Sequence, residues 1–149
     1  MTGGLSSLAA EPFCYLTTTG RVSGRPHTIE IWFGLKERTL YVLSGNGPRR
    51  RADWVKNLTK TPAVTVRIGD RELSGRARIV KDADEDSLAR RLLLEKYEPT
   101  YSGNLTDWGR TAMAVAVDLV LSLAREPLNE PDADDDADEP KAEAEYAQD

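Results

Sequence analysis

The chain of 149 residues contains one cysteine, Cys14, and one histidine, His27. One cysteine excludes an internal disulfide, and a single cysteine with a single histidine is too few for a zinc site, so we expect no metal. The longest apolar stretch, residues 112–124, is shorter than a bilayer is thick and contains Asp118. The first residues lack the basic and apolar regions of a signal peptide. The sequence therefore predicts a cytoplasmic protein without a transmembrane segment.

Charge is unevenly distributed along the chain. The net charge is −5, but residues 129–149 contain ten acidic residues and one basic residue, which leaves +4 on the remainder. This acidic segment has no apolar periodicity and little to bury, so it is predicted to be disordered. We expect a flexible N-terminus at residues 1–11, one folded domain at residues 12–126 and a disordered acidic tail at residues 127–149.

Six strands are predicted, at residues 13–19, 28–34, 39–44, 63–68, 71–80 and 112–123, with alternating apolar residues at 28–34, 63–68 and 112–123. Helices are predicted at residues 48–59 and 84–97, a turn at 35–38, a hairpin turn at 69–70 and an irregular loop at 99–107. Most connections are hairpins, and closing the sheet hides its edges. The predicted fold is mainly β: a six-stranded antiparallel barrel with flanking helices.

A basic loop, residues 20–25, separates the first two strands, and we call it the arginine loop. Its two glycines permit turns that point backbone N–H groups outward, because glycine tolerates positive φ. Its serine adds a hydroxyl donor, and its two arginines can each bind a phosphate or carboxylate. No helix follows, so the loop is neither a P-loop nor a dinucleotide fingerprint. It is predicted to hold an anion, with a solvated turn as the equal alternative.

A second basic segment, residues 44–51 (SGNGPRRR), leads from a strand into the first predicted helix. Unpaired N–H groups and the helix dipole create positive potential there, which disfavours arginine by about 0.3–1 kcal/mol. A bound anion would reverse that penalty, since each arginine–phosphate bond contributes about 1.5–3 kcal/mol. A solvated basic turn is again the alternative. Nucleic acid is not an expected partner, because a reading helix and a row of exposed aromatics are absent.

The motifs LTTTGRVSGRPHTIEIWF (residues 16–33) and LYVLSGNGPRRRADWVKNLTKTPAVTVRIGD (residues 40–70) resemble the deazaflavin-dependent nitroreductase family. The resemblance covers roughly residues 13–118. It implies the split β-barrel of the flavin/deazaflavin oxidoreductases, of pyridoxamine-phosphate-oxidase type. It also implies an oxidoreductase that transfers a hydride from reduced deazaflavin, coenzyme F-420, to a small electron-poor molecule: a quinone, an enone or a nitroaromatic.

The resemblance also assigns roles to residues. The arginine loop would take the cofactor's phosphate or acidic tail, the basic helix entrance the remaining tail charge, and the glycine-rich turn with Asn57 the edge of the ring. The implied cofactor-binding residues are Thr18, Gly20, Arg21, Ser23, Gly24, Arg25, Ser44, Gly45, Asn46, Gly47, Arg50, Arg51, Trp54 and Asn57. Tyr97 and Tyr101 fall where relatives place tyrosines over the substrate pocket, to orient the substrate or donate a proton. A core role is an alternative for Trp54, and a lid or core role is an equal alternative for Tyr97 and Tyr101.

Other interpretations remain open at this point. The same barrel could bind FMN, although three arginines at residues 49–51 suit a longer polyanionic tail better. A deazaflavin carrier without turnover, or a barrel that binds a protein or anionic lipid on its basic face, would show the same motifs. Small split barrels often pair, so a homodimer with the site at its seam is a further expectation.

Overall fold

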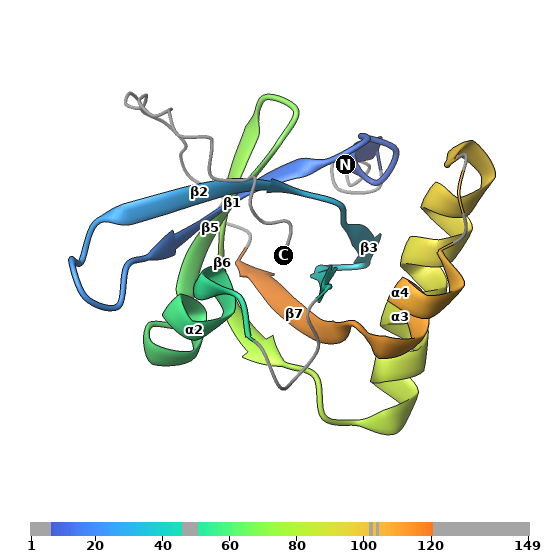
Figure 1. The fold of residues 1–149 in the computed structure, drawn as a ribbon. Helices are drawn as coiled ribbons and strands as arrows, with labels where there is room; N and C mark the ends of the chain where they lie inside the picture. The colour runs from blue at the N-terminus through green and yellow to red at the C-terminus, as the bar shows by residue number, and fades with distance from the viewer. Residues whose placement is uncertain (1–6, 46–50, 102, 104, 121–149) are drawn as a thin grey trace.

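The computed structural model describes residues 7–45, 51–101, 103 and 105–120, with the backbone alone at residues 106 and 107. Most of the predicted flexible N-terminus and all of the predicted acidic tail lie outside these residues. In the described part of the chain, seven antiparallel strands form one sheet (Figure 1). In chain order they are β1 (Cys14–Thr19), β2 (Pro26–Ile31), β3 (Gly34–Lys36), β4 (Thr39–Ser44), β5 (Ala63–Ile68), β6 (Arg71–Ile79) and β7 (Met113–Val120).

The two edge strands of the sheet are brought together because they are neighbours in the sequence. The strand order is β2-β1-β5-β6-β7-β4-β3, so the two edge strands are consecutive in sequence. Trp32 and Phe33 alone separate β2 from β3, and the sheet has to curl until these edges meet. No ladder joins β2 to β3 within the described ranges, so the barrel is split at this point. β2 and β3 therefore each have a ladder partner on one side only among the described residues.

The barrel interior is filled by inward-facing residues of the strands. Leu16, Val42, Val66 and Val115 come from four different strands and are all fully buried. Helix α2 (Asp53–Lys60) adds Trp54, Val55 and Leu58 to the same cluster. Each fully buried aliphatic side chain stabilises the fold by about 1.5–3 kcal/mol relative to exposure. This interior therefore fixes α2 against the barrel.

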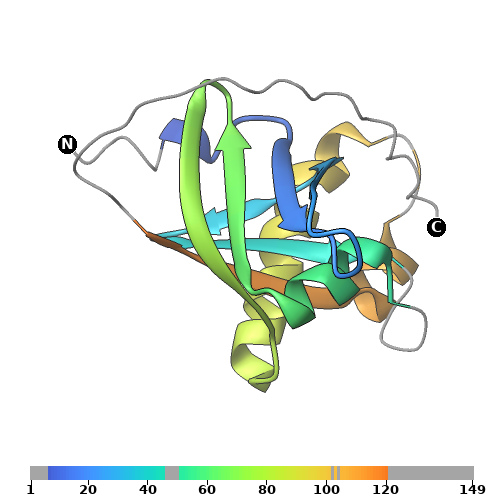
Figure 2. The same cartoon turned by 90° about the vertical axis from the view of Figure 1, so that its left-hand side faces the viewer.

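A second layer covers one side of the barrel wall. It consists of α3 (Ala83–Tyr97), the 3-10 turn η1 (Glu98–Thr100) and α4 (Thr106–Thr111). Beneath it, most of β4 and β7 is buried on both faces, because their outer side chains pack against these helices. Figures 1 and 2 place α2 and the β1–β2 loop on the opposite side of the barrel from α3. One side of the barrel is thus covered by a helical layer, and the other carries the β1–β2 loop packed on the short helix α2.

The structure confirms the fold class but corrects the prediction at three places. The predicted strand at 28–34 appears as β2, which begins at Pro26 and ends at Ile31, and Gly34 belongs to β3. The predicted turn at residues 35–38 contains β3, which pairs with β4 and makes seven strands instead of six. The predicted loop at 99–107 contains η1 and the start of α4. α4 is short and owes its place to tertiary contacts: Leu105 is buried, and Arg90 Nη1 of α3 donates to Gly109 O at 2.8 Å.

Some predicted boundaries lie partly outside the described residues. The predicted helix at residues 48–59 appears as α2, whose first described residue is Asp53. The predicted last strand, residues 112–123, appears as β7, and residues 121–123 are not described. Among the described residues, no helix has the length and apolar character needed to cross a membrane.

Candidate functional site

The arginine loop is a tight turn with its own hydrogen bonds. Gly20 N donates to Arg25 O at 2.7 Å, and Gly24 N donates to Gly20 O at 2.9 Å. Ser23 Oγ accepts from Arg25 N at 3.1 Å, so its proton remains for another partner. Gly24 has φ +75°, a conformation that side chains other than glycine rarely adopt. The loop is therefore preformed, as an anion-binding turn requires.

Gly20 is needed for a second reason, which is space. A Cβ atom at this position would lie 2.7 Å from His27 Nε2 and 2.8 Å from Ser23 Oγ. Both distances are shorter than real Cβ contacts, so the imidazole ring and the hydroxyl close over the glycine backbone. The one histidine of the chain therefore forms part of the wall of the arginine loop.

The arginine loop is hydrogen-bonded to helix α2. Asn57 is 4% exposed, and its Oδ1 accepts from Arg21 N at 3.1 Å and from Arg21 Nη1 at 2.9 Å. Its Nδ2 donates to Thr18 Oγ1 at 3.2 Å. Asp53 pairs with Arg21 Nη2 at 3.2 Å, and Lys60 Nζ donates to Arg21 O at 3.0 Å. The amide of Asn57 thus joins the end of β1 to the arginine loop.

Two arginines, one in the arginine loop and one before α2, form no ion pair with another described residue. Arg25 and Arg51 are both exposed, and neither forms an ion pair or a side-chain hydrogen bond with another described residue. Arg51 lies just before Ala52, the N-cap of α2, and this N-cap makes no side-chain hydrogen bond. The exposed guanidinium of Arg51 therefore adds positive charge next to a helix N-terminus, and that of Arg25 adds positive charge to the arginine loop; either suits a phosphate or carboxylate.

The glycine-rich turn begins next to a tryptophan. Ser44 ends β4 and is 2% exposed, and a Cβ at Gly45 would lie 3.6 Å from Trp108 Cδ1. From Gly45 the chain reaches Ala52 across at most about 25 Å, because an extended residue advances about 3.3–3.6 Å. Gly45, which lies beside Trp108, is therefore within about 25 Å of the start of α2, the helix to which the arginine loop is bonded.

Trp108 belongs to an aromatic cluster, made up of Trp32, Tyr97, Tyr101 and Trp108. The Trp32 and Tyr97 rings are stacked, with centroids 4.3 Å apart and an interplanar angle of 4°. Tyr101 and Trp108 meet Trp32 edge-on, at 5.8 and 5.7 Å. Trp32 and Trp108 are half-buried and Tyr101 is 46% exposed, so the cluster reaches the surface.

Within this cluster the Tyr97 hydroxyl is committed to the fold. It accepts from Phe33 N at 3.1 Å and lies within donating distance of Pro12 O (2.9 Å) and Phe33 O (3.2 Å). Burial raises the pKa of Tyr97 to about 12. Neighbouring Lys96 donates to the same Phe33 O at 3.2 Å, and burial lowers its pKa to about 8. Both side chains hold the link between β2 and β3 against the end of α3.

A family model described as F420H(2)-dependent quinone reductase matches residues 2–119, well over half of the sequence. The chain belongs to this family. It is accordingly a deazaflavin-dependent reductase that uses coenzyme F-420 and passes reducing equivalents to a small molecule. The resemblance, the enzyme class and the cofactor predicted from the motifs are confirmed, and FMN is not needed to explain them.

Solved structures with similar folds include an F420-H2 dependent reductase (FDR-A), 21% identical, with TM-score 0.58 over 71% of this chain and 93% of that one. A chain described as a domain-swapped dimer is 22% identical, with TM-score 0.59 over 71% and 79%. A FAD-binding protein from Mesorhizobium loti is 17% identical, with TM-score 0.55 over 78% and 87%. Together with relatives of pyridoxamine-phosphate-oxidase type, they confirm the split barrel. Curated protein sequences give no significant match.

In this F-420-dependent reductase the predicted site residues fall into two groups. The arginine loop, Thr18, Asn57 and Arg51 lie around the start of α2, whereas Ser44 and Gly45 lie beside the aromatic cluster with Tyr97 and Tyr101. Trp54 is 8% exposed and packs in the barrel interior, so contact between it and the cofactor stays a prediction. Asn46, Gly47 and Arg50 lie outside the described residues.

Sequence reasoning missed four residues of the reductase that surround these groups: Asp53, Lys60, Trp32 and Trp108. Asp53, Asn57 and Lys60 follow a spacing of four and three residues, which places them on one face of a helix. Trp32 alternates with Thr28 and Glu30 in the predicted strand 28–34, and a tryptophan in step with two polar residues was the available signal. Trp108 carried no signal, because it lies between the predicted loop at 99–107 and the predicted strand at 112–123, where no element was predicted.

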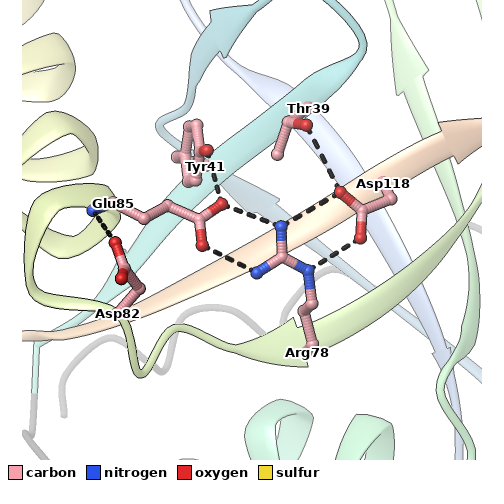
Figure 3. A network of polar contacts seen from close by, with 6 residues as sticks. All are labelled: Thr39, Tyr41, Arg78, Asp82, Glu85 and Asp118. Atoms are coloured by element: carbon pink, nitrogen blue, oxygen red, sulfur yellow. Dashed lines mark hydrogen bonds and ion pairs between the residues drawn. The ribbon is translucent and has the colours of Figure 1, made fainter.

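The largest ion-pair network of the described residues lies elsewhere (Figure 3). Arg78 of β6 bonds Glu85 of α3 at 2.8 Å and Asp118 of β7 at 2.7 Å, and Tyr41 donates to Glu85 at 2.7 Å. The bonds from Arg78, then from Tyr41, lower the pKa of Glu85 to about 2. All acceptors are matched by donors, so this network ties three strands and α3 together and leaves no group for chemistry.

Proposed function

We propose that the reductase transfers a hydride to a flat, electron-poor acceptor, with a quinone as the preferred class and enones and nitroaromatics as related acceptors. The aromatic cluster beside Gly45 is the observation that carries this proposal. Flat π-systems pack well on aromatic side chains, at centroid distances of about 4.5–7 Å. Trp108 offers a half-buried ring next to Gly45, and the half-buried ring of Trp32 meets it edge-on. The quinone chemistry in the family's description agrees with such a surface.

The position of the cofactor on this chain is the second part of the proposal. The described residues fit a cofactor with an anionic tail, because Arg25 and Arg51 are exposed without a described acidic partner. We place the charged part of F-420 at the arginine loop and Arg51, with Arg50 added from the sequence. The ring edge is placed at the backbone of residues 44–47, which leads to the aromatic cluster. When bound and reduced, F-420 supplies the hydride.

The chain's own groups then have positioning roles. The aromatic cluster orients the acceptor and excludes water from one of its faces, which contributes through proximity. A reduced quinone oxygen also requires a proton. Tyr101 is the favoured donor, because it is 46% exposed and its hydroxyl bonds no other described residue. Tyr97 remains the second candidate, although its hydroxyl bonds Phe33 and Pro12.

The test is an anaerobic assay in which menadione oxidises the reduced cofactor on the enzyme. We expect prompt recovery of oxidised F-420 absorbance. Trp32→Ala should lower kcat/KM for menadione about 2–10-fold, since an aromatic pair contributes about 0.5–1.5 kcal/mol. F-420 affinity should stay unchanged. The matched control is Tyr15→Ala, because Tyr15 lies on β1 with its ring against Phe13 and Arg67, away from the cluster. Equal effects of the two substitutions would contradict the acceptor site.

A homodimer is also part of the proposal, supported by the similar structure described as a domain-swapped dimer. Light scattering on the purified protein should give twice the mass of the 16.5 kDa chain. A monomer mass at micromolar concentration would contradict it. The cytoplasmic location expected from the sequence stays a prediction.

A further inference from the structure

The two arginines at the ends of the arginine loop have different surroundings. Arg21 is bonded to α2 through its backbone N, its backbone O and its guanidinium group. Arg25 uses its backbone N and O within the loop, for Ser23 Oγ and Gly20 N. Its exposed side chain makes no hydrogen bond or ion pair with another described residue. One arginine is therefore held by the fold and the other extends from it.

The residues that bond Arg21 lie on one face of α2. Nη1 donates to Asn57 Oδ1 at 2.9 Å and lies 3.4 Å from Asp53 O, while Nη2 donates to Asp53 Oδ1 at 3.2 Å. Lys60 Nζ closes the arrangement on the Arg21 carbonyl at 3.0 Å. A guanidinium group has five N–H donors, so most of the directions in which Arg21 could bind a ligand are already used.

Asn57 is the centre of this arrangement. Its side chain is buried, its Oδ1 accepts two bonds from Arg21, and its Nδ2 bonds Thr18 Oγ1 at 3.2 Å. Turning this amide toward a cofactor ring would leave the Arg21 amide and guanidinium without a buried acceptor. Buried polar groups rarely remain unpaired. The amide therefore serves the loop.

We propose that Asn57 and Arg21 are positioning residues that lock the arginine loop onto α2, and that Arg25 is the loop arginine that contacts the anionic part of F-420. This inference rests on the proposed placement of the cofactor. The sequence assigned anion binding to Arg21 and Arg25 equally, whereas this inference assigns anion binding to Arg25 and positioning of the loop to Arg21. It also assigns Asn57 to the shape of the loop instead of the edge of the ring.

An anion could in principle draw Arg21 away from Asp53, and the geometry weighs against this. Asp53 is 85% exposed, so its ion pair with Arg21 is weak and easily exchanged. The bond from Nη1 to the buried Asn57 Oδ1 has no such replacement, because water reaches that oxygen poorly. Arg21 stays in place whether or not Asp53 is displaced.

The first experiment measures amide hydrogen exchange of residues 20–25 in the cofactor-free protein. Arg21→Ala and Asn57→Ala should each speed exchange of the Gly20 and Gly24 amides at least 10-fold. Arg25→Ala, in the same loop, should leave these rates within about 2-fold of wild type. Asn57→Asp keeps the acceptor for Arg21, so it should retain the slow rates and serve as a rescue if the alanine variant folds poorly. Unchanged exchange in both Arg21→Ala and Asn57→Ala would overturn the positioning role.

The second experiment compares lysine and alanine replacements by F-420 fluorescence titration. Lysine keeps a charge but lacks the fork that reaches two acceptors at once. Arg25→Lys should bind F-420 within about 3-fold of wild type, and Arg25→Ala about 10-fold more weakly. Arg21→Lys should lose as much affinity as Arg21→Ala. Normal binding by Arg21→Lys, with loss in Arg21→Ala, would show that Arg21 contacts the anion and would overturn the inference.

The two experiments separate this inference from the proposed cofactor position. If exchange responds as expected but Arg25→Ala and Arg21→Ala both bind F-420 normally, the arginine loop does not hold the cofactor, and the assignment of Arg25 fails with that placement. If Arg25→Ala weakens binding but Asn57→Ala changes neither exchange nor affinity, the placement stands and the positioning role is wrong.

Discussion

Replacing Tyr97 with phenylalanine separates a structural hydroxyl from a catalytic one. The substitution removes the acceptor of the Phe33 N–H, at 3.1 Å, and the donor that lies 2.9 Å from Pro12 O. Tyr97 is 7% exposed, so water replaces these bonds poorly. A buried group left unpaired costs about 1–3 kcal/mol. Because each kcal/mol shifts Tm by about 3–5 °C for a domain of this size, we expect Tm to fall by roughly 3–15 °C.

The assay is thermal unfolding followed in parallel with menadione reduction. A general acid contributes about 100-fold or more, so loss of a catalytic proton donor would be unmistakable. Tyr97→Phe should keep kcat within about 3-fold of wild type below its Tm. Tyr101→Phe is the matched control: it should leave Tm unchanged and lower kcat. An unchanged Tm with a 100-fold fall in kcat for Tyr97→Phe would refute this reasoning.

Three further predictions concern acid stability, the arginine loop and the single thiol. The pKa of Glu85 is lowered to about 2, below the value of about 4.3 for the unfolded chain. This shift stabilises the fold above about pH 4.3, and the stabilisation is lost as the pH falls toward 2. Glu85→Gln should therefore flatten the decline of Tm over that interval, and an acid profile identical to that of wild type would argue against this. Gly20→Ala should weaken F-420 binding at least 10-fold in a fluorescence titration, because its Cβ would press on the His27 ring at 2.7 Å; wild-type affinity would show that the loop tolerates the shift. Cys14 is fully buried and its pKa is raised by burial, so Ellman's reagent should react with it after denaturation, and rapid labelling of the native protein would contradict this.

Much of the sheet could be predicted from local apolar patterns. β5 (Ala63–Ile68) has the predicted boundaries because a strand that buries one face of a barrel needs an apolar residue at every second position. β4 (Thr39–Ser44) also has the predicted boundaries, as a short apolar run that is buried on both faces. Gly69 and Asp70 join β5 to β6 as the predicted hairpin turn. These features depend on neighbouring residues, so the local pattern is sufficient.

Two of the errors in the fold have different causes. β3 is three residues long and pairs with β4 across a two-residue turn at Glu37 and Arg38, where Glu37 has φ 57° and no glycine signals the turn. α4 is held by Arg90 and by the burial of Leu105 under α3. Tertiary contacts of this kind override weak local preferences, and no window of sequence contains them.

In the candidate site, too, features set by neighbouring residues could be predicted, and features set by distant residues could not. The arginine loop could be located from its glycines and its place between two strands. The different roles inferred for Arg21 and Arg25 could not, because Asp53 and Asn57, which bond Arg21, lie more than thirty positions further along the chain. The aromatic cluster was missed for a similar reason, since Trp32 and Trp108 meet only when the outer helical layer folds over the barrel.

The central claim, that basic groups around the arginine loop hold the charged part of F-420, is tested most directly with two ligands. Wild-type protein and Arg25→Ala are titrated with F-420 and with the deazaflavin chromophore that lacks the phosphate-bearing tail. We expect Arg25→Ala to bind F-420 about 10-fold more weakly, as loss of one charge-assisted bond requires, and to bind the chromophore as wild type does. An equal effect on both ligands, or none on F-420, would contradict the account.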